Sequence, residues 1–204
     1  MTDAPIILAV DAARVLGWSY GRAGEPPISG AIECAKAGQH RAATFSGAGQ
    51  WITRFVKAHP VDLLVIEAPF HASLQTNQQT ADVLLGLPAV LEFMAYQFGV
   101  RRMERVNQSS VKKHFVAKGN GDQKAPIRRK CIALGWVTQD EADADKGFNR
   151  TDALAVWSYA EHQIAPKIAQ PVDQLFAASM KRKRLAAEKA AEATRQPCLR
   201  EETF

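Results

Sequence analysis

Two apolar runs, each ending in an acidic residue, constrain the fold of this chain most strongly. Pro5–Val10 (PIILAV) is rich in β-branched residues and leads into Asp11, and Asp62–Ile66 (DLLVI) leads into Glu67. Continuous runs of this kind are typical of strands that are buried on both faces of a sheet. Such a sheet needs helices on each side, so the two runs predict an α/β architecture.

The rest of the chain supplies the other expected elements. We expect further strands at Gly17–Arg22, Ser29–Ala35 and Val100–Val106, and helices at Arg41–Ala58, Gln75–Phe98, Ser109–Phe115, Pro126–Leu134 and Thr151–His162. Pro88 marks a point where the long second helix could break, and Gln139–Phe148 reads as a polar loop. The order of elements predicts a mixed five-stranded sheet with helices on both faces.

Composition indicates an ordinary globular protein, with 204 residues, 47% hydrophobic and 23% charged. We expect one domain over residues 1–165, followed by a basic, helical or partly disordered tail at 166–204. The three cysteines form no CxxC pair, which favours a reducing cytoplasm over a secreted disulfide scaffold. We expect neither a signal peptide nor a membrane span, because no apolar run has the required length and flanks.

Positive charge gathers in two places. Residues 181–204 hold seven Lys and Arg against four Glu, and residues 101–130 hold ten Lys and Arg against two acidic residues. Basic blocks of this density can follow a phosphate backbone, since each cation displaces condensed counterions. A solvated helix face has the same composition, so the charge alone does not decide between the two interpretations.

Three acidic residues stand at the ends of predicted elements. Asp11 and Glu67 each follow a buried strand, and Asp152 lies in the first turn of an amphipathic helix. A buried carboxylate needs a partner or a metal, and three that converge would repel one another without divalent cations. Hard oxygen ligands suit Mg²⁺ or Mn²⁺, and two such ions can support phosphodiester hydrolysis. The plainer interpretation is that each acid is an ordinary strand-end or helix-start residue.

Four blocks in this order resemble the motifs of the RuvC-like Holliday-junction resolvases, which belong to the RNase H-like nuclease superfamily. They are ILAVDAARVLGW (7–18), VIEAPF (65–70), VKKHFVAKGNG (111–121) and TDALAVW (151–157). The resemblance covers about residues 5–165 and implies an RNase H-like fold. It also implies a metal-dependent, structure-selective DNA endonuclease that resolves four-way or other branched junctions. A homodimer is implied as well, with Gln75–Phe98 as the dimer element.

Carried over by position, the resemblance implies metal ligands at Asp11, Glu67 and Asp152, which would hold two Mg²⁺ or Mn²⁺ ions in each active site. The family usually has D-x-x-D at the start of the last helix, whereas this chain has Asn149-Arg150-Thr151-Asp152. Asn149 can offer a carbonyl oxygen to a cation, and we favour it as the fourth ligand. Asn149 could instead be only the N-cap of the helix, with Asp145 or Asp143 as substitute ligand.

The resemblance also implies a set of DNA-binding residues. They are Phe70, Lys112, Lys113, Lys118, Asn120 and Lys124. Phe70 matches an aromatic position that contacts bases at the junction, and Lys112 matches a lysine that faces phosphates near the metals and can assist catalysis. The family's loop lysine aligns with Gln123, so Lys124 lies one position late and ranks below Lys112 and Lys118.

Three other functions compete with junction cleavage. An RNase H-type nuclease would keep the fold and the metals but cut another nucleic acid, and the block at 111–121 disfavours it. A catalytically impaired junction-binding protein is suggested by Asn149. An actin-like ATPase also begins with Asp after a strand, but it would need a second glycine-rich phosphate loop. The sequence leaves open whether a branch-migration partner exists.

Overall fold

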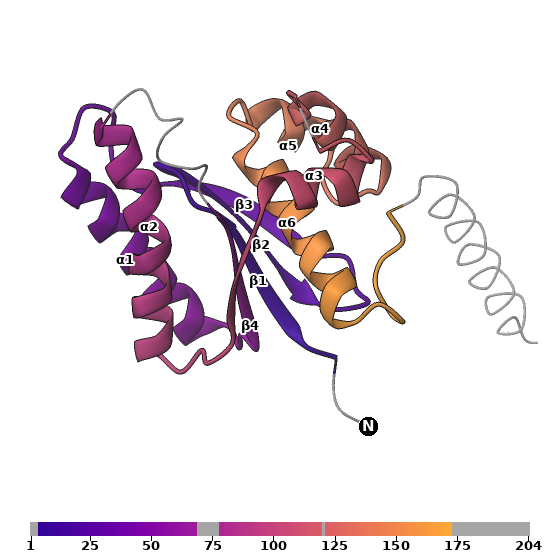
Figure 1. Ribbon diagram of the computed structural model, residues 1–204, viewed down its shortest axis with the longest axis horizontal. Coiled ribbons are helices and arrows are strands. Elements are labelled where there is room, and N and C mark those ends of the chain that lie inside the picture. Colours follow the sequence, from indigo (N-terminus) through magenta and orange to yellow (C-terminus); the bar gives the residue numbers. More distant parts are fainter. Residues whose placement is uncertain (1–3, 69–77, 120, 173–204) are drawn as a thin grey trace, which may run out of the picture. The chain divides into compact units, whose positions relative to one another are not determined.

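The computed structural model describes residues 4–68, 78–119 and 121–172, and Figure 1 shows one sheet flanked by helices on both faces. The strands are β1 (Ile6–Asp11), β2 (Val15–Arg22), β3 (Ile28–Glu33), β4 (Leu63–Glu67) and β5 (Met103–Val106). The helices are α1 (Arg41–Ala58), α2 (Gln78–Gln97), α3 (Gln108–Val116), α4 (Lys124–Ala133), α5 (Gln139–Ala144) and α6 (Asn149–Ile164).

The sheet is mixed, with the strand order β3-β2-β1-β4-β5. β1, β2 and β3 pair antiparallel, whereas β4 lies parallel to both β1 and β5. The predicted mixed five-stranded sheet is therefore confirmed. Because β1 and β4 run in the same direction, their carboxyl ends meet at one edge of the sheet.

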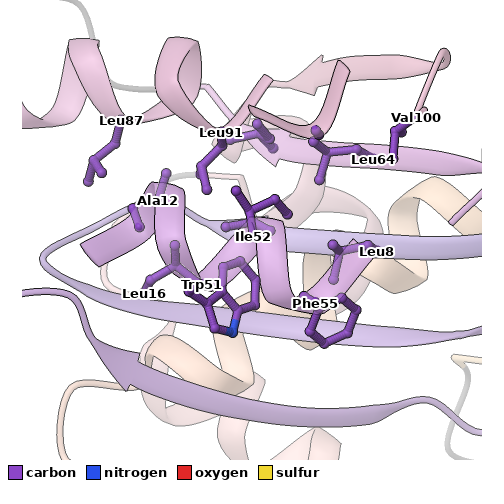
Figure 2. Packing of buried hydrophobic residues seen from close by; sticks show 14 residues of the cluster. Leu8, Ala12, Leu16, Trp51, Ile52, Phe55, Leu64, Leu87, Leu91 and Val100 are labelled. Atoms are coloured by element: carbon purple, nitrogen blue, oxygen red, sulfur yellow. The ribbon is translucent and has the colours of Figure 1, made fainter. Parts of the chain in front are cut away.

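The two faces of β1 explain its uninterrupted apolar sequence. Leu8 and Val10 belong to the cluster under α1 and α2, where Figure 2 shows Leu8 near Ile52 and Phe55 of α1. Their neighbours Ile7 and Ala9 point to the opposite face, where α6 packs on β1 and β2. These four residues are fully buried, which explains why no polar residue alternates with them.

Two local predictions were wrong. The predicted polar loop contains α5, which begins with a capping box in which Thr138 and Glu141 each bond the other's backbone amide. The predicted break in α2 is absent, and Pro88 lies inside the helix. Leu87 and Leu91 are fully buried against the sheet, and this packing holds α2 continuous through Pro88.

The chain divides into two compact units, residues 1–170 and 171–204. The first unit ends just after α6, where the buried carboxylate of Glu161 accepts hydrogen bonds from the amides of Gly24 and Gln170 at 2.7 and 2.8 Å. Residues 166–170 are thus fastened to the body, past the boundary expected at 165. Within the described ranges, no helix has the length and hydropathy required to cross a bilayer.

Candidate active site

Asp11 and Glu67 lie beside each other at the carboxyl edge of the sheet. The preceding residues, Val10 of β1 and Ile66 of β4, are direct partners in the parallel ladder. Asp11 is also paired with Gly17 across the antiparallel ladder between β1 and β2. The sheet register alone therefore brings two of the predicted carboxylates together.

Gly17 allows α6 to begin directly over this edge. A Cβ atom added at Gly17 would lie 1.8 Å from the carbonyl oxygen of Asn149, the first residue of α6. No side chain fits between the two backbones, so only glycine permits this approach. This close approach brings Asp152, in the first turn of α6, near Asp11.

The pKa values reflect this convergence. Burial, followed by the charges of Glu67 and Asp152, raises the pKa of Asp11 well above its ordinary range. Burial, followed by the charge of Asp152, raises the pKa of Glu67 from 4.5 to about 7. Burial likewise raises the pKa of Asp152 from 3.8 to about 6. Three carboxylates in a poorly hydrated place need protons or cations to remain there.

Two lysines supply part of the compensating charge. Both Lys112 and Lys124 lower the pKa values of Glu67 and Asp152, and Lys124 also lowers that of Asp11. Lys112 Nζ donates to Gln108 Oε1 at 3.1 Å. The two predicted lysines thus face the predicted carboxylates.

Gln108 is a site residue that the sequence analysis missed. Its side chain hydrogen-bonds Glu67, which lowers the pKa of that carboxyl, and it accepts from Lys112. It is the first residue of α3, immediately after the capping residue Asn107. Polar residues are common at the start of a helix, so nothing in the local sequence marked Gln108 as a site residue.

The turn before α6 assigns separate roles to Asp145 and Asn149. Asp145 Oδ1 accepts from the Arg150 amide at 3.4 Å, and its Oδ2 accepts from the Thr151 amide at 3.1 Å. The Asp152 amide bonds the Phe148 carbonyl at 2.8 Å. The alternative of Asn149 as N-cap was therefore wrong, because the N-cap residue is Phe148 and the Asp145 side chain accepts from the amides of the first turn.

The side-chain amide of Asn149 packs over Gly147, where an added Cβ would lie 2.3 Å from Asn149 Nδ2. The alternative ligand Asp143 is exposed on α5 and accepts from Gln139 at 3.0 Å. Asp145 and Asp143 both have partners of their own. Asn149 remains our prediction for the fourth ligand.

The remaining predicted DNA-binding residues are more dispersed. Lys113 and Lys118 are exposed on α3 and on the loop that follows it. Phe70 and Asn120 lie outside the described residues. Part of the basic block is also engaged within the protein, because Arg105 forms a two-pronged ion pair with Glu92 at 2.7 and 2.6 Å. The charge available to a partner is therefore smaller than the sequence suggests.

The donor set fits a hard divalent cation in chemistry. Three converging carboxylates, two of which have pKa values raised by the charges of the others, match the oxygen ligands that Mg²⁺ and Mn²⁺ prefer. Over residues 4–68, 78–119 and 121–172, no three His, Cys, Asp or Glu side chains already stand as a formed metal cluster. The carboxylates would have to close around an ion by side-chain adjustment.

Comparison with known proteins rests on structure. No protein-family model and no curated protein matches the sequence. The fold is similar to Thermus thermophilus RuvC, with a TM-score of 0.57, 14% identity, and coverage of 81% of this chain and 99% of RuvC. The same protein in complex with a Holliday junction substrate gives a TM-score of 0.59, 12% identity, and 82% and 99% coverage.

The yeast mitochondrial Holliday junction resolvase Ydc2 is also similar, with a TM-score of 0.50 and 12% identity. The match covers 85% of this chain and 83% of Ydc2. Identities this low carry information about the fold and not about activity. The chain has the RNase H-like fold of the RuvC-like resolvases.

Proposed function

We propose that this protein is a metal-dependent, structure-selective endonuclease that resolves Holliday or other branched DNA junctions by phosphodiester hydrolysis. The observation that carries the proposal is the convergence of Asp11, Glu67 and Asp152: the charges of Glu67 and Asp152 raise the pKa of Asp11, and the charge of Asp152 raises that of Glu67. They come from β1, β4 and α6, elements far apart in the chain. A merely structural carboxylate would not need two like charges beside it.

Asp11, Glu67 and Asp152, with the side-chain oxygen of Asn149, would hold Mg²⁺ or Mn²⁺. Two such ions, when bound, would activate a water molecule and stabilise the leaving oxygen of the phosphodiester. Glu67 is oriented for this role by its hydrogen bond from Gln108.

The lysines act on the substrate side of the site. Lys112 is tethered through Gln108, so its ammonium stays beside Glu67 without forming a direct ion pair. Lys124 Nζ donates to the Gly147 carbonyl at 3.3 Å at the start of α6. Positively charged groups held there would attract the scissile phosphate and stabilise the negative charge that develops on it.

Branched DNA is the proposed substrate, because the similar RuvC structure holds a Holliday junction and Ydc2 is a Holliday junction resolvase. Symmetric cleavage of a four-way junction needs two sites related by a two-fold axis, which a homodimer provides. α2 supports this assembly, since it exposes the large apolar side chains of Leu85, Phe93 and Tyr96.

A cavity of about 520 Å³ lies between α1 and α2, and its lining includes Phe45, Gly49, Val90 and Met94. An exposed aromatic ring of one protomer and an apolar hollow of the other are complementary across a two-fold axis. We propose this face as the dimer interface.

Cleavage of a labelled immobile four-way junction tests the proposal, with linear duplex and RNA–DNA hybrid as competing substrates, in Mg²⁺, Mn²⁺ or EDTA. We expect symmetric, metal-dependent cuts confined to the junction. Asp11→Asn, Glu67→Gln and Asp152→Asn should each abolish cutting and leave junction binding largely intact. Asp140→Asn, which alters an exposed acid on α5, is the matched control.

Other outcomes point to the competing functions. Preferential cutting of the hybrid would replace the proposal with an RNase H-type activity. Tight junction binding without cuts in either metal would identify a binding protein with an impaired site.

A further inference from the structure

Phe148 adopts a backbone conformation that a bulky residue rarely takes. Its φ is 64° and its ψ is 10°, and Ala117 is the only other non-glycine residue with positive φ in the described ranges. Surrounding hydrogen bonds hold the conformation. The Phe148 amide donates to the Asp145 carbonyl at 3.1 Å, and its own carbonyl accepts from the Asp152 amide at 2.8 Å. Strain of this kind persists only where neighbouring structure fixes it, and it is typical of functional sites.

The ring that this conformation presents is in contact with cations from α4. The guanidinium carbon of Arg128 lies 3.9 Å from the ring centroid. Arg128 also donates to the Asp145 carbonyl, while its buried Nε has no acceptor among the described residues. The guanidinium therefore lies against the aromatic ring, and Arg128 helps to fix the ring in place.

The second cation at the ring is Lys124, one turn before Arg128 on α4. Its Nζ lies 5.6 Å from the centroid and 3.3 Å from the Gly147 carbonyl. Lys124 is the cation that acts on all three site carboxylates. The Lys124 side chain is exposed, so without these contacts its ammonium would sample many positions in water.

We propose that Phe148 is a positioning residue that holds the ammonium group of Lys124 at the carboxylate site. The inference rests on the proposed function, because the use of a fixed ammonium there is to meet the phosphate of a DNA strand. It also explains how a lysine at position 124 can serve the site from the start of a helix. Its flexible stem is restrained by the ring together with the Gly147 carbonyl.

The test compares Phe148→Leu with Phe148→Tyr in the full chain. Leu keeps apolar bulk but removes the π face, whereas Tyr keeps the ring, and both side chains must accept the same backbone strain. The first readout is the NMR spectrum of selectively labelled lysine without DNA or metal. Ring current should displace the Lys124 side-chain signals in the unchanged protein and in Phe148→Tyr, and Phe148→Leu should remove that displacement.

The second readout is affinity for a four-way junction in EDTA, over a range of salt concentrations. Phe148→Leu should weaken binding by about two- to fivefold and lower the salt dependence, as expected for loss of one cation–π contact and one phosphate contact. In a Lys124→Gln background the same change should have no further effect. Phe148→Tyr should bind like the unchanged protein.

The proposal would be overturned if Phe148→Leu weakened junction binding equally with and without Lys124. It would also be overturned if the Lys124 side-chain signals were the same in Phe148→Leu as in the unchanged protein. Failure of the proposed function looks different. The unchanged protein would then show no preference for the junction, while the lysine spectra would still uphold or reject the contact between Phe148 and Lys124.

Discussion

The carboxylates of Asp145 and Glu161 are buried, and each accepts hydrogen bonds from backbone amides. Asp11, Glu67 and Asp152 are partly buried, and no backbone amide of the described residues donates to their side chains. Satisfied acids of the first kind fasten turns and helix ends. Asp11 and Glu67 in addition face the charges of neighbouring carboxylates, a cost that protons or cations relieve, and this difference singles out the candidate site.

The raised pKa of Glu67 predicts how stability depends on pH. An acid whose folded pKa lies above its unfolded value is most stabilising below the unfolded pKa, and that stability is lost as pH rises through the folded pKa. In EDTA, the free energy of unfolding should therefore fall by about 1–3 kcal/mol between pH 4.5 and 7.5, and Mg²⁺ should restore part of it. Denaturant titrations at the two pH values measure this.

Glu67→Gln is the variant that checks the assignment. It cannot ionise, so its unfolding free energy should change less with pH and should exceed that of the unchanged protein at pH 7.5. A pH dependence identical to that of the unchanged protein would show that Glu67 does not carry the electrostatic cost.

Gly17→Ala should separate α6 from the sheet edge. The added methyl group would lie 1.8 Å from the Asn149 carbonyl oxygen, and both partners are backbone, so the helix start must shift. We expect a loss of about 1–3 kcal/mol in unfolding free energy, together with loss of junction cleavage. Thermal unfolding and the cleavage assay measure the two effects.

Gly49→Ala is the matched control. Its methyl group would make ordinary contacts at 3.5 Å with Met94, and alanine is the better helix former by about 0.5–1 kcal/mol. Equal behaviour of the two variants would contradict the close approach at Gly17.

At the scale of elements, the sequence predicted those strands and helices whose burial requires a clear hydrophobic pattern. β1 and β4 were predictable because burial on both faces requires apolar runs, and α1 was predicted with its observed bounds, Arg41–Ala58. The missed helix α5 is short and polar, so it has no apolar stripe to reveal it. Its T-x-x-E capping box at Thr138–Glu141 was nevertheless readable.

The site itself was only partly readable. Strand ends identified Asp11 and Glu67, but tertiary packing sets the contacts of Gln108 and Phe148. A glutamine at a helix start and a phenylalanine before a helix carry no local sign of what lies opposite them. Those assignments depend on how α3 and α4 pack against α6, which periodicity does not encode.

Truncation tests where the body ends. A chain ending at residue 165 lacks Gln170, so Glu161 loses one of its amide donors and the body should lose about 1–3 kcal/mol of unfolding free energy. A chain ending at residue 172 keeps that bond and should unfold like the body of the full chain. Denaturant titration of both truncated chains measures the difference, and equal stability would place residues 166–170 outside the body.

At the scale of the whole molecule, the proposed dimer face can be tested by charge. Phe93 is 62% exposed on α2, and Ile28 is 58% exposed on β3. Phe93→Glu should produce a monomer that retains its fold and loses paired cuts, since a charge cannot be buried between two apolar faces. Ile28→Glu introduces the same charge at similar exposure and should leave a dimer. Sedimentation velocity distinguishes them, and a dimer that survives Phe93→Glu would exclude this face.

The contact of Gly17 with Asn149 joins the β1–β2 hairpin to α6. The ribosome synthesises the hairpin early and α6 late in the translation of the body. The three carboxylates therefore cannot meet until α6 has left the exit tunnel, however early the sheet begins to form. A nascent chain, or a fragment released before α6, holds no assembled site. Under the proposed function, a chain can cut DNA only after the body has been made in full.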